Sequence, residues 1–175
     1  LDETRVTQPA IYALQTALTE TLAARGIRPT AVLGHSIGEY AAARTAGIFS
    51  LEDGLDLALE RGELVGALRE KGGMAAVLAS LNDVAGCLTR FNRLGVAAVN
   101  GDDTVVLAGE AGQLEEALTE LEGLGIAHRP MPGSHAFPCP LNEPIPPDPG
   151  RSPARHSFSP PPLPHIPSLI HLLPS

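Results

Sequence analysis

A Gly-x-Ser-x-Gly turn between an apolar run and a helix-forming run is the feature that most limits how this chain can fold. Residues 31–33 are apolar and predict a short buried strand, and residues 39–46 are rich in helix formers. The motif Gly34-His35-Ser36-Ile37-Gly38 lies between them. Such a strand–turn–helix arrangement exposes the serine hydroxyl at a helix N-terminus. It predicts Ser36 as a nucleophile and the backbone N–H of Ile37 as a donor to an oxyanion.

The two glycines of this turn are expected to avoid collisions that a Cβ atom would cause in so sharp a bend. A plainer alternative is that Ser36 only caps the following helix. The flanking strand and helix, together with His35 beside the serine, favour a nucleophile.

Composition bounds the class of protein. The chain has 175 residues, 43% of them hydrophobic, and a net charge of −8, which argues against binding to nucleic acid or an anionic membrane. Its two cysteines, Cys87 and Cys139, have no metal-binding spacing and suit a reducing compartment, so we expect a cytoplasmic protein. No apolar run is long enough for a membrane span, and no secretory leader is recognisable.

Two helices are expected around the turn. The first covers 6–25, with Thr7 as N-cap and Gly26 as the stop. Its predicted core-facing stripe is Ile11, Leu14, Leu18 and Leu22. The second helix is capped by Ser50 and covers 51–70.

The pattern changes after this second helix. Strands are predicted at 74–79, 96–99, 104–108 and 126–129, and helices at 82–94 and 113–121. This β-α-β-β-α-β order is that of a ferredoxin-like unit. Cys87 falls on its first helix and is expected to be a small buried residue.

The last part of the chain is rich in proline. Residues 138–175 hold 13 of the 17 prolines. Such a composition cannot bury enough apolar surface to fold, so a disordered tail is predicted over 146–175.

Several motifs together resemble one enzyme family. In chain order they are Thr7-Gln8-Pro9-Ala10, Gly34-His35-Ser36-Ile37-Gly38-Glu39-Tyr40, Arg61, Gly73-Met74-Ala75-Ala76-Val77, Ala98-Val99-Asn100-Gly101 and Ser134-His135-Ala136-Phe137. Over about residues 5–145 the chain resembles malonyl-CoA:acyl-carrier-protein acyltransferases, in particular the acyltransferase domains of modular polyketide synthases.

The resemblance implies an incomplete α/β-hydrolase-like acyltransferase core, with a ferredoxin-like α+β subdomain inserted at 73–131. Residues 1–72 would belong to the large α/β subdomain, and 132–145 would be the remnant of the segment that carries the catalytic histidine. The chain would be part of a larger multidomain synthase of polyketide or fatty-acid biosynthesis.

The resemblance also implies the chemistry. Ser36 would take a malonyl-type group from coenzyme A as an acyl-serine and pass it to the phosphopantetheine thiol of an acyl carrier protein, without a metal or a tightly bound cofactor. Arg61 would bind the malonyl carboxylate, and Gln8, His35 and Asn100 would complete the substrate site. Taken alone, Gln8 and Arg61 would be a solvated first-turn residue and a surface arginine. Ile37 and the His-Ala-Phe residues are similar to those of malonyl-selecting members.

The chain departs from the family pattern at three places. The catalytic histidine position is occupied by Pro138, followed by Cys139 in place of serine, and His135 is three residues away from that position. The family's Gly-Gln loop, a second oxyanion donor, would lie upstream of Leu1, and the proline-rich tail replaces the family's C-terminal portion. We therefore expect little or no transfer by the chain as it stands.

Two alternatives remain at this stage. One is a truncated, catalytically inactive acyltransferase fragment, whose tail could arise from a shifted reading frame. The other is a serine hydrolase that shares the turn but expects an acid and a histidine on a continuing parallel sheet.

Overall fold

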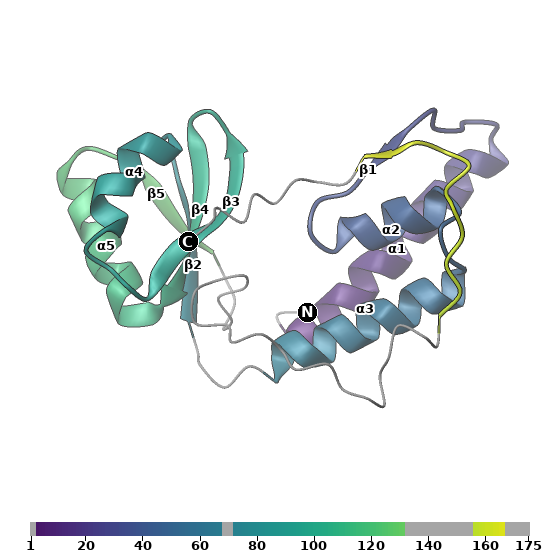
Figure 1. Ribbon diagram of the computed structural model, residues 1–175, viewed down its shortest axis with the longest axis horizontal. Coiled ribbons are helices and arrows are strands. Elements are labelled where there is room, and N and C mark those ends of the chain that lie inside the picture. The colour runs from purple at the N-terminus through teal and green to yellow at the C-terminus, as the bar shows by residue number, and fades with distance from the viewer. Residues whose placement is uncertain (1–2, 68–71, 132–155, 167–175) are drawn as a thin grey trace. The chain divides into compact units, whose positions relative to one another are not determined.

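The computed structural model describes residues 3–67, 72–131 and 156–166 (Figure 1). They form two compact units. The first unit combines 3–66 with 156–166, and the second unit comprises 67–131. The first of these boundaries lies after residue 66, whereas the sequence placed it after residue 72. No helix within the described ranges is long and apolar enough to cross a membrane.

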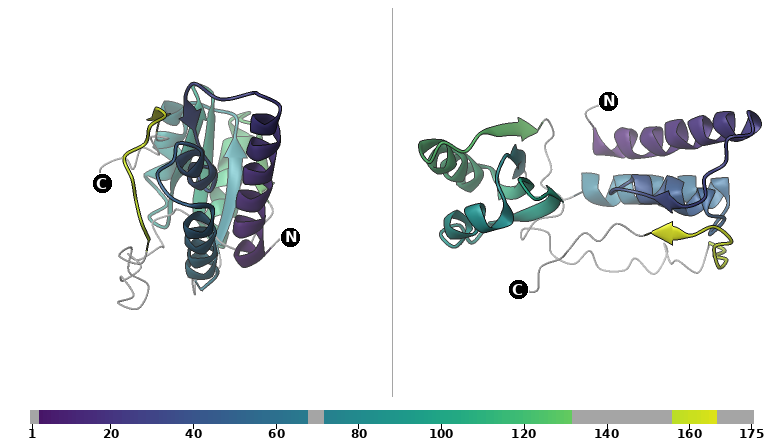
Figure 2. Two further views of the ribbon diagram at one scale, coloured as in Figure 1. Left: turned by 90° about the vertical axis from the view of Figure 1, so that its right-hand side faces the viewer. Right: turned by 90° about the horizontal axis from the view of Figure 1, so that it is seen from above.

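The first unit packs three helices against each other beside a short parallel strand pair. Its elements are α1 (Thr4–Ala24), β1 (Val32–Leu33), α2 (Gly38–Thr45), α3 (Leu51–Gly66) and β6 (His165–Ile166). Helices α1 and α3 run side by side (Figure 2), and both contact α2. Strand β1 is one residue shorter than predicted. Ala31 and Leu33 are exposed, Leu33 by 65%, and Val32 is only half-buried, so the expectation of a buried strand is wrong.

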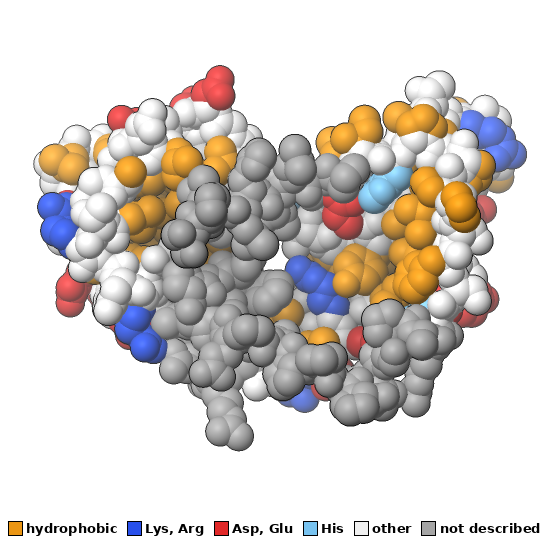
Figure 3. Space-filling model, in the orientation of Figure 1, with side chains coloured by type: hydrophobic (Ala, Val, Ile, Leu, Met, Phe, Trp, Pro, Cys, Tyr) orange, Lys and Arg blue, Asp and Glu red, His pale blue; other side chains and the backbone are white. Residues whose placement is uncertain are grey.

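Helix α1 buries a face with polar residues and a tyrosine, and not the apolar stripe that was predicted. Gln8, Tyr12 and Thr16 are buried, whereas Leu14 and Leu18 of the predicted stripe are 61% and 55% exposed. Apolar side chains accordingly lie at the surface of the first unit (Figure 3). The apolar period was read correctly, but its assignment to the core is wrong.

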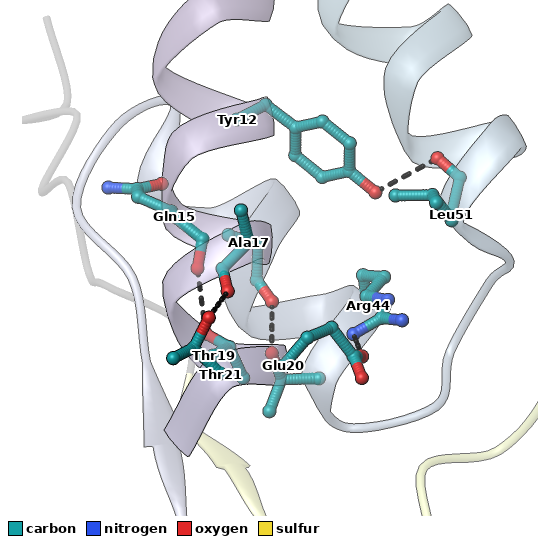
Figure 4. Close-up of polar contacts among 10 residues, drawn as sticks. Tyr12, Gln15, Ala17, Thr19, Glu20, Thr21, Arg44 and Leu51 are labelled. Atoms are coloured by element: carbon teal, nitrogen blue, oxygen red, sulfur yellow. Dashed lines mark hydrogen bonds and ion pairs between the residues drawn. The ribbon is translucent and has the colours of Figure 1, made fainter. Parts of the chain in front are cut away.

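Close approach of α1 to α3 explains this reversal. A Cβ on Gly54 would lie 2.1 Å from the Tyr12 hydroxyl oxygen, and one on Gly62 would lie 3.2 Å from the Cα of Arg5. Tyr12 fits over this small-residue surface and donates a hydrogen bond to the carbonyl of Leu51 over 3.1 Å (Figure 4). Complementary size and a satisfied hydroxyl therefore select the buried face, because bulky leucines would hold the helices apart.

The ends of the helices test the predicted caps. Helix α1 begins at Thr4 after Glu3, so the assignment of Thr7 as N-cap is wrong; its hydroxyl donates to the Glu3 carbonyl instead. Gly26 has φ +82° just past the C-cap and confirms the predicted stop. Ser50 accepts a hydrogen bond from the N–H of Asp53 over 3.0 Å and confirms the start of α3.

The second unit has the predicted β-α-β-β-α-β order. Its elements are β2 (Gly72–Val77), α4 (Leu81–Leu88), β3 (Leu94–Gly101), β4 (Thr104–Glu110), α5 (Ala111–Gly123) and β5 (His128–Met131). The strands form an antiparallel sheet in the order β3-β4-β2-β5. Helix α4 is shorter than predicted. A capping box of Ser80 and Asp83 fixes its start.

One apolar cluster joins the sheet of the second unit to its two helices. Its buried members include Val77, Val84, Cys87, Leu107 and Leu121. Cys87 is 3% exposed, as predicted. Alternating strand residues and the apolar faces of α4 and α5 meet in this core, so sequence periodicity is a sufficient guide here.

Residues 156–166 contradict part of the predicted disordered tail. The N–H of Val32 donates to the carbonyl of Pro164 over 3.0 Å, and β6 pairs with β1 in parallel. The N–H of Ser159 donates to the carbonyl of Ile48, and Phe158 meets Phe49 edge-on with ring centroids 6.1 Å apart. Proline removes a donor but keeps its carbonyl acceptor, so a proline-rich strand can pair at one edge. The other residues of the predicted tail lie outside the described ranges.

Candidate active site

The turn between β1 and α2 holds Ser36 in a left-handed backbone conformation. Its φ is +53°, and it is the only non-glycine residue in the described ranges with a positive φ. The N–H of Gly38 donates to the carbonyl of His35 over 3.0 Å, and the N–H of Glu39 donates to that of Ser36 over 3.1 Å. A serine in this conformation costs about 1 kcal/mol or more, which favours a functional turn over an ordinary cap.

Only one of the two motif glycines lies so close to neighbouring backbone that a Cβ atom could not fit there. A Cβ on Gly34 would lie 2.3 Å from the Cα of Glu39, which no side chain could tolerate. A Cβ on Gly38 would meet only the side chain of Gln15, at an ordinary 3.5 Å. The prediction is therefore confirmed at Gly34 and wrong at Gly38.

Arg61 reaches Ser36 from α3. Its Nη2 donates to Ser36 Oγ over 3.2 Å, and its Nη1 donates to Oε1 of Gln8 on α1. Gln8 is 8% exposed, so its amide is not a solvated first-turn group. Three predicted site residues from separate parts of the chain are thus brought together.

Burial tunes this cluster. It lowers the pKa of the Arg61 guanidinium from its ordinary value, and the nearby Tyr40 opposes that shift. The guanidinium stays protonated near neutral pH because its ordinary pKa is so high. The result is a fixed, partly desolvated cation beside the serine oxygen, suited to binding a carboxylate.

Tyr40 ends the motif that carries the resemblance, but the sequence analysis assigned it no role in the site. It is half-buried against the cluster of Tyr12, Ala41 and Ala58, and burial raises the pKa of its phenol. Tyr40 lies in the first turn of α2, close enough to Arg61 for the guanidinium to oppose the rise in its pKa.

The remaining predicted residues lie elsewhere. His35 is exposed and lines a cavity of about 520 Å³ bordered by α1, β1 and α2, whose lining includes neither Ser36 nor Arg61. Asn100 belongs to the second unit, where it is exposed within β3. His135, Pro138 and Cys139 lie outside the described residues. Ile37 is the N-cap of α2, so its N–H lies at the positive end of that helix.

A strained serine on a strand–turn–helix element, with an arginine on its hydroxyl, defines an acyltransferase-like class of site. The family model for the acyl transferase domain matches residues 1–167, and the chain belongs to this family. The match extends through β6, so the expectation that the resemblance ends near residue 145, with a tail replacing the rest, is wrong.

Its relatives include polyketide synthases and a transacylase. The chain is 42% identical over 164 residues to polyketide synthase GfsA of Streptomyces halstedii, covering 93% of this chain and 2% of that one. The acyltransferase domain from the second module of the salinomycin polyketide synthase is 38% identical, with a TM-score of 0.81 over 95% of this chain and 40% of that chain. A malonyl CoA-acyl carrier protein transacylase from Clostridium perfringens is 29% identical, with a TM-score of 0.75 over 81% of this chain and 46% of its own. The chain thus spans less than half of these solved proteins and a small part of the synthase.

Proposed function

We propose that Ser36 accepts a malonyl-type acyl group from coenzyme A and passes it to the phosphopantetheine thiol of an acyl carrier protein, within a cytoplasmic multidomain polyketide synthase. The first unit would be part of an α/β-hydrolase-like core, and the second unit its ferredoxin-like insertion. Fatty-acid synthesis would use the same reaction. The observation that carries the proposal is the hydrogen bond from Arg61 to Ser36.

Two displacements make up the proposed reaction. The serine oxygen attacks the thioester carbonyl, the carbon–oxygen bond forms, and the carbon–sulfur bond breaks as coenzyme A leaves with the proton. The carrier thiol sulfur then attacks the acyl-serine carbonyl. The new carbon–sulfur bond forms, the carbon–oxygen bond breaks, and the serine oxygen takes back the proton. Backbone N–H groups near Ile37 would stabilise the negative oxygen of each tetrahedral intermediate.

The position of Arg61 supports a short dicarboxylic acyl group. The guanidinium is within hydrogen-bond reach of the nucleophile, so a carboxylate bound there must lie close to the carbonyl under attack. In a malonyl group a single methylene separates these two carbons, whereas an acetyl group has no carboxylate. When Arg61 binds the carboxylate with two parallel hydrogen bonds, these would replace its hydrogen bond to Ser36. The solved transacylase relative named above agrees with this substrate class.

The general base is the part of the mechanism that the chain lacks at its expected position. Proline at 138 has no titratable group, and general-base assistance contributes about 10²–10⁴-fold. We therefore expect slow acylation. His135 is a substitute only if it reaches the serine to about 3 Å.

Intact-mass measurement after prolonged incubation with malonyl-CoA tests the proposal. We expect one malonyl adduct that maps to Ser36 and disappears in Ser36→Ala. Ser50→Ala is the matched control, because Ser50 is a true helix N-cap and its loss should leave the adduct in place. Pro138→His should form the adduct at least as fast. An adduct on another residue, or none on either the chain or Pro138→His, would refute the assignment.

The serine-hydrolase alternative gains no support from the fold. It requires an acid and a histidine on a parallel sheet that continues after the turn. The chain instead continues from α3 into the antiparallel sheet of the second unit, and within the described residues only β6 pairs in parallel with β1.

A further inference from the structure

The 156–166 segment carries two histidines, and each contacts a carboxylate in the first turn of a helix. His156 Nδ1 lies 2.9 Å from Asp53 Oδ1 at the start of α3. His165 Nε2 lies 2.9 Å from Glu39 Oε2 at the start of α2. Both side chains of the His165–Glu39 pair are largely buried, at 16% and 24% exposure.

The His165–Glu39 pair spans the turn that holds Ser36. On the entry side, β1 leads into the turn, and Val32 pairs with His165 in the strand register. On the exit side, Glu39 lies in the first turn of α2, and its N–H donates to the Ser36 carbonyl. The backbone of His165 therefore lies beside the strand that enters the turn, and its side chain bonds the residue that leaves it.

A hydrogen bond between the two sides of the turn can stabilise the strained conformation of Ser36. A serine at φ +53° is strained and keeps that conformation only when its surroundings fix the backbone on both sides. A hydrogen bond from an imidazole N–H to a partly buried carboxylate is stronger than one in water, because solvent competes less for either group.

We infer that His165 is a positioning residue for the nucleophile: its Nε2–H donates to Glu39 and fixes the Ser36 turn between β1 and α2. Its importance for catalysis rests on the proposed role of Ser36, but its effect on the turn does not. The two residues are 126 positions apart, so the sequence offered no spacing that could reveal them.

Hydrogen exchange of the amides of Gly38 and Glu39 reports directly on the turn, since both amides close it. His165→Leu removes the donor and should accelerate their exchange about 2- to 10-fold, the range expected for loss of one hydrogen bond. His165→Gln keeps an N–H donor and should restore exchange close to that of the unchanged chain.

His156→Leu is the matched control. It removes the other histidine–carboxylate contact of the same segment, which is made to α3, so exchange at Gly38 and Glu39 should stay unchanged. Unchanged exchange in His165→Leu, or equal acceleration in His156→Leu, would overturn the inference. If His165→Leu does not fold, Glu39→Ala removes the acceptor instead and must give the same acceleration.

The malonyl adduct at Ser36 is measured on the same samples. Accelerated exchange in His165→Leu without any adduct on the unchanged chain or on Pro138→His would keep the positioning role and refute the proposed function. An adduct that forms at the same rate in the unchanged chain and in His165→Leu, with unchanged exchange, would refute the positioning role alone.

Discussion

The two units are stabilised in different ways. The second unit buries valines and leucines from its sheet and both helices in one apolar cluster. The first unit buries Gln8, Tyr12 and Thr16 on α1 while leucines of the same helix are exposed. Among the described residues, its buried interior is made of small residues, Val65, one tyrosine ring and the polar side chains of Gln8 and Thr16.

This difference separates stability from function. The core of the second unit follows from apolar burial, which is non-directional and tolerates many sequences. The first unit holds a glutamine, a serine and an arginine in fixed relation, and such a site needs directional contacts and close backbone approach. We therefore expect core truncations to act mainly in the second unit and polar or steric changes mainly in the first.

The largest effect should come from Leu107→Ala in the second unit. Leu107 is fully buried, and its truncation should lower the free energy of unfolding by about 2–5 kcal/mol. Native-state hydrogen exchange of the amides of β4 measures that loss. Leu18→Ala in α1 should cost less than about 0.5 kcal/mol, because Leu18 is 55% exposed. Equal costs at both positions would show that the exposed stripe is buried in solution.

Arg61→Ala should change transfer selectivity without a comparable effect on stability. Malonyl transfer should fall about 10- to 150-fold, corresponding to about 1.5–3 kcal/mol for charged hydrogen bonds, and acetyl transfer much less. A competition assay with both coenzyme A thioesters, on the chain with Pro138→His, gives the ratio.

Arg44→Ala is the control for this arginine, since Arg44 pairs with Glu20 elsewhere in the first unit. The malonyl-to-acetyl transfer ratio of Arg44→Ala should equal that of the chain that carries Pro138→His alone. Equal losses of malonyl and acetyl transfer in Arg61→Ala would mean that Arg61 acts only on the structure.

Two glycine-to-alanine substitutions should change the free energy of unfolding in opposite directions. In Gly54→Ala the added methyl would lie 2.1 Å from the Tyr12 hydroxyl and should cost about 1–3 kcal/mol in the first unit. In Gly86→Ala on α4 nothing lies within 4 Å of the new methyl, and the second unit should gain about 0.4–1 kcal/mol. Urea denaturation of each variant, followed by hydrogen exchange in each unit, tests both signs. Stabilisation by Gly54→Ala would disprove the close packing of α1 on α3.

The smallest effects concern acid pH. Hydrogen bonds to His156 and Ser50 lower the pKa of the Asp53 carboxyl, and hydrogen bonds to Ser80 lower that of Asp83. Because the folded pKa lies below the ordinary 3.8, this stabilisation is fully present above that value and is lost as pH falls through the folded pKa. Unfolding at pH 5 and below should therefore be less pH-dependent in Asp53→Asn and in Asp83→Asn.

Asp53 and Asp83 should differ in one respect. Asp83 acts within its own helix cap, whereas Asp53 also contacts the 156–166 segment. Asp53→Asn should therefore accelerate exchange of the Ser159 amide, which donates to Ile48, and Asp83→Asn should not. The same exchange rate in both variants would show that the contact of Asp53 with His156 does not hold the segment.

The sequence by itself determined the elements whose information is local. The β-α-β-β-α-β order, the caps at Ser50 and Gly26 and the turn around Ser36 all follow from neighbouring residues. Motif spacing, read through the family resemblance, also predicted that Gln8 and Arg61 belong with Ser36. Backbone propensity and periodicity act over a few residues, so they are visible in a single sequence.

Only the tertiary structure decided which face of α1 is buried, and it decided where the 156–166 segment lies. Hydropathy favoured the leucine stripe, but the small residues of α3 select Tyr12 and Gln8 because they let the helices approach closely. Composition predicted disorder around His165, yet its backbone pairs with β1 and its side chain bonds Glu39. Both outcomes depend on partners distant in the sequence, and shape and hydrogen-bond complementarity between such partners leave no periodic trace in it.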